Sequence, residues 1–277
     1  MSSTNTRALQ VLNLVIIIAT IAVNALANIL PINGVNTGEV ANSPGYFNYF
    51  TPAVYVFSIW FVIYVLMVLF GIYQVRSSQR EMDYIKQIGF LIIINGIFNM
   101  LWIFIFHFSV APGDPNTAYP EIFALSMVPM VFILITLLWA YVRLGIGMKS
   151  VPLNEKLGVH LLFSVYSGWI SVAIIANIAS TINSFLVIPV DWQYLWTALV
   201  LIVALLITML MLIQRRDFAF GLVVIWASFG IYMKHSLISL IAVPALAVAI
   251  IVALTILLLP FIKKKNFIDF YLVRDSM

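Results

Sequence analysis

The sequence contains no cysteine and few charged residues. The absence of cysteine excludes disulfides, thiolate metal sites and cysteine nucleophiles. Asp, Glu, Lys and Arg make up 9% of the 277 residues, against roughly 25% in a soluble globular domain. The sequence shows no nucleotide-binding loop and no zinc motif, and its three histidines share no ligand-like spacing. It therefore predicts neither a metal site nor a nucleic-acid partner, and it offers no catalytic residue.

Apolar residues dominate instead, at 64% of the chain, with a mean hydropathy of +1.10. The apolar segments are about as long as the ~20 residues that a membrane-spanning helix needs, and longer than the strands of a membrane barrel. We therefore predict an all-α, polytopic transmembrane helical bundle of about eight helices. The expected spans are residues 8–30, 52–75, 88–108, 122–144, 158–182, 193–213, 218–233 and 236–262.

The basic residues give the orientation of this bundle. Cytoplasmic loops of membrane proteins are enriched in Lys and Arg. If the N-terminus is inside, all but one of the 14 basic residues fall on the cytoplasmic side, and only Lys234 lies outside. The inside set is Arg7, Arg76, Arg80, Lys86, Arg143, Lys149, Lys156, Arg215, Arg216, Lys263, Lys264, Lys265 and Arg274. The charges predict that both termini are cytoplasmic. The Ala25–Ala27 pair resembles a signal-peptidase site, but the apolar run before it is long, so we expect a retained helix.

No Asp, Glu, Lys or Arg lies in the middle of any expected span. Proton-coupled transporters usually keep ionisable groups at that depth, and a retinal protein needs a buried Lys with a counter-ion. The sequence therefore argues against both classes.

Uncharged polar and aromatic side chains follow helical spacing on four of the expected spans. These residues are Asn24 and Asn28; Phe57, Trp60 and Tyr64; Asn95, Asn99 and Trp102; and Tyr166, Trp169, Ala173, Asn177 and Ser180. Each can be interhelical packing, because an Asn in a span often hydrogen-bonds a neighbouring helix. Together they can also form a ligand pocket, which is mostly apolar with a few directed polar groups. Six of them would lie in the outer half of the bilayer, namely Asn24, Asn28, Trp60, Asn99, Trp102 and Asn177.

Three stretches resemble the tryptophan-rich sensory protein and translocator protein family, TspO/MBR, whose members include the peripheral benzodiazepine receptor. "FTPAVYVFSIWFVIY" (50–64) resembles the family's entry into its second helix. "INGIFNMLWIFIF" (94–106) resembles the third helix, and "YSGWISVAIIANI" (166–178) the fifth. Their order and spacing also match.

The resemblance implies a five-helix TspO-like core at residues 1–183. Three additional transmembrane helices and a short basic cytoplasmic tail would follow at residues 184–277. It also implies an outer-leaflet pocket between the first, second, third and fifth helices, capped by residues 31–51. The candidate ligand-binding residues are Trp60, Trp169, Asn99, Asn95, Trp102, Tyr64, Phe57, Ala173, Asn177, Tyr166, Asn28 and Pro52.

Family members bind porphyrins and other tetrapyrroles, and some bind sterols. The resemblance therefore implies a membrane receptor or sensor for a planar hydrophobic molecule, most of all a porphyrin or haem-type ligand, with no covalently bound cofactor. A transporter of a tetrapyrrole or other lipophilic metabolite, a light-dependent porphyrin-degrading enzyme and a scaffold remain alternatives. We expect a multi-pass protein of a prokaryotic cell membrane, in contact with membrane lipids, and we leave a homodimer open.

Two features depart from the family pattern. The family's double proline is replaced by Thr51–Pro52, and the tryptophan just before it is absent, with Tyr49 and Phe50 nearby. These differences lie in the expected cap, so the range of ligands can differ from that of shorter members.

Overall fold

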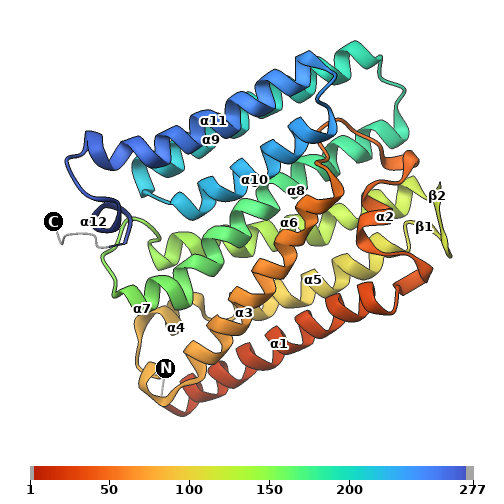
Figure 1. The fold of residues 1–277 in the computed structure, drawn as a ribbon. Coiled ribbons are helices and arrows are strands. Elements are labelled where there is room, and N and C mark those ends of the chain that lie inside the picture. Colours follow the sequence, from red (N-terminus) through yellow and green to blue (C-terminus); the bar gives the residue numbers. More distant parts are fainter. Residues whose placement is uncertain (1–2, 273–277) are drawn as a thin grey trace.

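The computed structural model describes residues 3–272. Within that range, eight helices of 17 residues or more run along one another (Figure 1). They are α1 (Ser3–Ile29), α3 (Ile59–Val75), α5 (Leu91–His107), α6 (Pro120–Leu144), α8 (Leu161–Phe185), α9 (Val190–Arg215), α10 (Phe218–Lys234) and α11 (Ser239–Ile262). Each corresponds to one span expected from the sequence. The all-α, polytopic bundle is therefore confirmed, and the helix ends shift by a few residues.

Six segments of the described range are long and apolar enough to cross a bilayer. They are Thr6–Ile29, Val54–Val75, Pro120–Leu144, Leu153–Phe185, Val190–Arg215 and Ser239–Ile262. Helices α5 and α10 have 17 residues each. At 1.5 Å per residue each is about 25 Å long, slightly less than a ~30 Å hydrocarbon core. The expected span 88–108 is shortened at Gly89, whose φ of +53° separates α5 from the short helix α4 (Asp83–Ile88).

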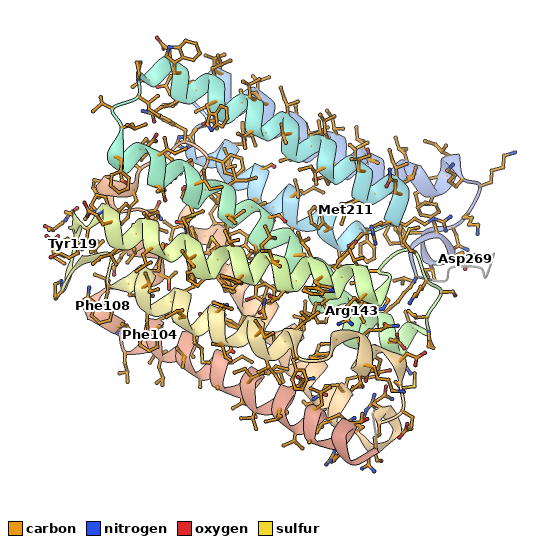
Figure 2. All side chains as sticks on the ribbon, turned by 180° about the vertical axis from the view of Figure 1, so that it is seen from behind. Phe104, Phe108, Tyr119, Arg143, Met211 and Asp269 are labelled. Atoms are coloured by element: carbon orange, nitrogen blue, oxygen red, sulfur yellow. The ribbon has the colours of Figure 1, made fainter. Side chains whose placement is uncertain are left out.

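Both termini lie at one end of the bundle. In Figure 1 the N and C labels lie beside α4, α7 (Leu153–Glu155) and α12 (Phe267–Tyr271), and α2 (Thr37–Ala41) with strands β1 (Val110–Ala111) and β2 (Asp114–Ala118) lies at the other end. Figure 2 shows Arg143 and Asp269 toward one end and Phe104, Phe108 and Tyr119 toward the other. The expected basic residues thus gather at the terminal end; Arg274 lies outside the described residues. We call this the inner end and the opposite one the outer end.

The helices pack around two apolar cores that meet at α8. The first core joins α1, α3, α5, α6 and α8, and the second joins α9, α10, α11 and α12. Gly168 of α8 allows the close approach of α10, because a Cβ at this position would lie 3.2 Å from Val223 Cβ. Helix α8 contacts both groups of helices, so the two cores are continuous through it.

The connections at the outer end are short structured turns. The 3-10 turns η1 (Ile32–Gly34) and η2 (Pro44–Tyr46) flank α2, and η3 (Val54–Ser58) leads into α3. Strands β1 and β2 form an antiparallel hairpin where the sequence suggested only a loop. At the inner end, η4 (Ser77–Gln79) follows α3, and the π-helical turn η5 (Lys156–His160) joins α7 to α8.

A buried hydrogen-bond chain ties three helices of the first core together. Asn24 Nδ2 on α1 donates to Asn99 Oδ1 on α5 at 2.6 Å, and Asn99 Nδ2 donates to the Tyr166 hydroxyl on α8 at 2.7 Å. All three side chains are buried. Lipid cannot supply these hydrogen bonds, so each of the three side chains needs the others to satisfy its polar atoms.

The orientation can be tested with fused reporters. A reporter placed after Arg80, Lys149, Arg216 or Lys265 should give a cytoplasmic signal, because the basic residues gather at this end. Reporters near Asn36, Asn116 and Ser184 should give an outside signal. A cytoplasmic signal at Asn116 would contradict the eight-helix path.

Replacing Asn99 by Leu should destabilise the bundle. The change keeps an apolar volume but leaves the Tyr166 hydroxyl without its donor and removes one of the two acceptors of Asn24 Nδ2, at a cost of about 1–2 kcal/mol. Thermal and denaturant unfolding in detergent would measure the loss. Asn154→Leu, at an exposed position of α7, is the control and should change stability by less than about 0.5 kcal/mol. Equal stability of the two variants would show that the hydrogen-bond chain does not contribute to the stability of the bundle.

Candidate functional site

Six aromatic side chains from η3, α3, α5 and α8 meet near the outer end. The Trp60 ring lies 6.1 Å from Trp102 and 5.7 Å from Tyr64, centroid to centroid, in stacked arrangements. Edge contacts at 5.9 Å and 6.3 Å connect it to Tyr166 and Trp169. Phe57 adds an edge contact to Trp169 at 5.8 Å. Such pairs each contribute roughly 0.5–1.5 kcal/mol beyond the area they bury. All six residues belong to the set predicted from the sequence.

A cavity of about 60 Å³ lies beside this cluster, and we call it the outer cavity. It lies between α3, α5, α6 and α8 and beneath the segment 37–52. Its lining residues are all uncharged: Thr37, Ala41, Thr51, Pro52, Phe57, Trp60, Trp102, Phe106, Phe123, Met130, Trp169, Val172, Ala173, Ala176, Asn177 and Ser180. The wall is mostly apolar with one amide and three hydroxyls, which is the usual composition of a small-molecule site.

Two tryptophans of this wall each have a buried indole N–H without a hydrogen-bond partner. Trp102 is 5% exposed and Trp169 is 2% exposed, and the Nε1 atom of each lacks an acceptor within the described residues. A buried donor without an acceptor costs about 1–3 kcal/mol. Asn177 Nδ2, by contrast, donates to Ser126 Oγ and to Met130 Sδ, both at 3.4 Å. The wall of the outer cavity therefore offers two indole N–H groups that an added acceptor would satisfy.

Other buried polar atoms lack partners too. Both amide atoms of Asn13 and the Oδ1 atom of Asn95 are examples, but neither residue lines the outer cavity. The two indoles differ from these atoms because they share a cavity wall with an aromatic cluster.

The cap over the outer cavity is fixed by hydrogen bonds within the segment and to α8. Asn36 starts α2 with a capping box, in which its side chain accepts from Glu39 N and its own N–H donates to the Glu39 carboxylate. Asn48 donates to Thr51 Oγ1 and to Ser180 Oγ, both at 2.7 Å, so the cap is attached to α8. The Tyr46 hydroxyl donates to the Ser109 carbonyl and accepts from Tyr119 N.

Burial raises the pKa of the Tyr46 phenol, which keeps it in the neutral form that donates this hydrogen bond. The cap therefore carries no charge at this contact near neutral pH.

The end of α10 also holds the cap. Ala53 N donates to the Gly230 carbonyl at 3.2 Å, and Trp226 Nε1 donates to the Val56 carbonyl at 3.0 Å. Lys234 Nζ donates to Asn42 Oδ1 at 3.0 Å. No residue of α9, α10 or α11 is among those that line the outer cavity, but α10 positions the segment that covers it.

The structure brings seven of the predicted ligand-binding residues to the cavity wall. These are Pro52, Phe57, Trp60, Trp102, Trp169, Ala173 and Asn177. Tyr64, Tyr166 and Asn99 lie behind this wall, in the aromatic cluster and in the hydrogen-bond chain from α1.

Two predicted residues serve packing instead. Asn95 donates to Thr136 Oγ1 at 2.9 Å and to the Ile133 carbonyl, so it faces α6. Asn28 accepts from Thr37 N at the start of the cap. Helix α1 contributes no residue to the wall, contrary to the expectation, because its Asn side chains hydrogen-bond α5, the cap and their own helix. Helix α6 takes that place through Phe123 and Met130.

The sequence contained some signal for the wall residues that were missed. Phe106 continues the stripe of Asn95, Asn99 and Trp102 by one turn, and Ala176 and Ser180 continue the stripe on α8. Phe123 and Met130 carry no such signal, because α6 has apolar residues all round. Tyr49 and Phe50 lie near the position where the family has its loop tryptophan. Tyr49 packs on Tyr194 at 4.8 Å, and Phe50 belongs to the second core. Neither lines the outer cavity.

The comparison with known proteins agrees with this arrangement. No curated protein and no solved structure matches the chain. A family model described as TSPO-like protein matches residues 10–258, a range that includes most of α1, all of α3, α5, α6, α8, α9 and α10, and most of α11. The chain therefore belongs to the TSPO-like protein family.

Proposed function

We propose that the protein is a membrane sensor that binds a planar, hydrophobic molecule with hydrogen-bond acceptors in the outer cavity. The pair of buried indole N–H groups without acceptors carries this proposal. Family membership and the helical bundle support a membrane-embedded binding protein in general. A porphyrin suits the wall best, because its large aromatic face can stack on Trp60 and Trp102 while its polar groups reach the indole N–H groups and Asn177.

The size of the outer cavity sets a condition on this proposal. Its volume of about 60 Å³ is far below the ~300–1,000 Å³ of typical ligand pockets. A porphyrin therefore requires that the cap moves outward or that Trp60, which is only half-buried, changes position. Both movements leave the Asn99 chain in place below. In this mechanism, ligand binding displaces the cap, and α10 follows because it is hydrogen-bonded to that cap.

The absence of charged side chains in the outer cavity favours sensing over proton-coupled transport. The wall holds no group that could take up a proton near neutral pH. Binding energy would come from aromatic stacking, apolar burial and the polar atoms described above.

Titration of the purified protein with protoporphyrin tests the site directly. Trp169→Phe removes one indole N–H and part of the aromatic face, and Asn177→Leu removes the polar group of α8. Each should weaken binding about threefold to tenfold, since a loss of 1.4 kcal/mol corresponds to a factor of ten. Porphyrin absorbance and tryptophan quenching would measure the affinity. Trp139→Phe is the matched control, because Trp139 is 57% exposed on α6 and packs on Arg143. Unchanged affinity in both site variants, with folding confirmed, would contradict the assignment.

A second variant tests the role of α10 from outside the outer cavity. A Cβ at Gly230 would lie 2.1 Å from Val56 Cγ2 and 3.2 Å from Pro52 Cβ, so Gly230→Ala must push the cap. We expect porphyrin affinity to fall at least threefold. Gly221→Ala is the control on the same helix, because its Cβ would meet Ile256 and Leu212 rather than the cap. Equal effects of the two substitutions on affinity would show that α10 does not set the cap position.

A further inference from the structure

A second cavity lies at the inner end, where α6, α8, α9 and α10 meet α12. Its volume is about 180 Å³, and we call it the inner cavity. It is separate from the outer cavity and has no wall residue in common with it. Helix α12 closes one side through Phe270, Tyr271 and Leu272.

The inner cavity is surrounded by basic side chains. Lys149, Lys156, Arg215 and Arg216 are among its lining residues, and Asp217 is the one acidic residue among them. Asp217 is buried, and its carboxylate accepts from Tyr141 Oη at 2.7 Å and from Phe220 N at 3.0 Å, where it caps α10. Burial raises the pKa of this carboxyl group. The Asp217 carboxylate is thus already hydrogen-bonded within the protein. The four basic side chains outnumber it, so the wall has a net positive charge.

The basic groups are held in place around the inner cavity. Arg215 donates to the Ile146 carbonyl at 3.0 Å, Arg216 stacks over the Phe270 ring at 4.7 Å, and Lys156 donates to the Tyr271 carbonyl at 3.1 Å. An arginine carries five N–H donors, so one carbonyl contact does not exhaust Arg215. These contacts preorganise the positive groups, which reduces the entropy lost when an anion binds.

A buried imidazole adds a polar atom to the same wall. His160 Nε2 is buried and has no hydrogen-bond partner within the described residues; the nearest carboxylate oxygen, Glu155 Oε1, is 3.8 Å away. An oxygen-rich anion in the inner cavity would give this nitrogen a partner when it carries a proton.

An apolar groove lies next to the inner cavity. It runs over α8 between α3 and α10, with a volume of about 410 Å³, and is lined by Ser58, Ile59, Val62, Leu161, Val165, Phe218, Ala219, Leu222, Val223 and Trp226. Leu161, Phe218 and Ala219 line both the groove and the inner cavity, so the two are neighbours. From Phe218 to Trp226 the groove follows α10 for about 12 Å at 1.5 Å per residue. Val62 and Leu222 are exposed, which leaves the groove open toward lipid.

We propose that an anionic phospholipid of the cytoplasmic leaflet binds here, with its phosphate group in the inner cavity and one acyl chain in the groove. The basic residues lie at the depth of the inner headgroups, where positively charged pockets between helices attract acidic lipids. The groove supplies an apolar path for the chain that begins at the same three residues. A soluble phosphate compound would use only the inner cavity, and a zwitterionic lipid would gain little from the positive wall.

Native mass spectrometry of the detergent-solubilised protein tests whether the inner cavity binds the lipid phosphate. The probes are phosphatidylglycerol, phosphatidylcholine with the same acyl chains, and glycerol 3-phosphate. We expect phosphatidylglycerol to bind at least fivefold more tightly than either of the others. Replacing Lys149 and Arg216 together by Gln should weaken phosphatidylglycerol binding about tenfold, because each basic group near a membrane surface contributes to the attraction of acidic lipid. The matched control is the pair Lys263→Gln and Lys264→Gln, which removes two exposed charges outside the inner cavity.

A groove variant provides an independent test if the charge variant does not fold. Val62→Trp should fill the groove and weaken phosphatidylglycerol binding severalfold. Val65→Trp, one turn along α3 and also exposed, does not line the groove and should leave binding unchanged. Equal affinity for phosphatidylglycerol and phosphatidylcholine would overturn the proposal. An equal loss of phosphatidylglycerol binding in a variant and in its control would overturn it too. Binding of glycerol 3-phosphate as tight as that of the lipid would do the same, because it would make the inner cavity a site for soluble phosphates.

Discussion

Hydrocarbon offers no hydrogen-bond partners, and this constraint decides where each polar side chain of the bundle lies. Asn24, Asn99 and Tyr166 satisfy one another across α1, α5 and α8. Asn95 finds its partners on α6. Deep polar groups of this kind hold helices together because the surrounding lipid cannot compete for their hydrogen bonds. The two indole N–H groups at the outer cavity depart from this rule, and a departure beside a cavity indicates an absent partner more strongly than a polar residue in a packed seam does.

The same constraint explains why only part of the site was predictable. Polar and aromatic stripes stand out in an apolar span, and they identified Trp60, Trp102, Trp169 and Asn177 correctly as neighbours. The stripes could not show which side of a helix was packing and which was cavity. Asn95 and Asn177 have the same chemistry and similar spacing from a tryptophan, and both donate to α6, yet only Asn177 lines the cavity. That difference depends on how far each helix is rotated about its axis, which several neighbouring helices determine together.

The fold was easier to predict than the site because it rests on stronger signals. Eight apolar runs and nearly all basic charges agree on one path through the membrane, and the energetic cost of violating either signal is large. The shortness of α10 was also visible in its sequence. Contacts between distant segments were not visible in the sequence. Nothing local predicts that Gly230 receives a hydrogen bond from Ala53, or that α12 folds back over Arg216. The hairpin of β1 and β2 was missed because Pro112–Gly113 indicates a turn but the flanking residues are too few to show strand alternation.

Helix α10 connects the two ends of the molecule. Near its start, Phe218 and Ala219 line the inner cavity, and Asp217 caps the helix by accepting from Phe220 N. Near its other end, the Gly230 carbonyl accepts a hydrogen bond from the segment that covers the outer cavity, and Trp226 Nε1 donates one to that segment. A helix of 17 residues with intact backbone hydrogen bonds moves as a rigid element, so a displacement of the cap reaches the inner end without large changes within the helix. Coupling between two sites requires an element with two arrangements that both sites influence. In this bundle α8 lines both cavities, whereas α10 lines the inner cavity and hydrogen-bonds the segment that covers the outer one. If the outer cavity binds a ligand as proposed, α10 thus connects that site to the basic inner surface.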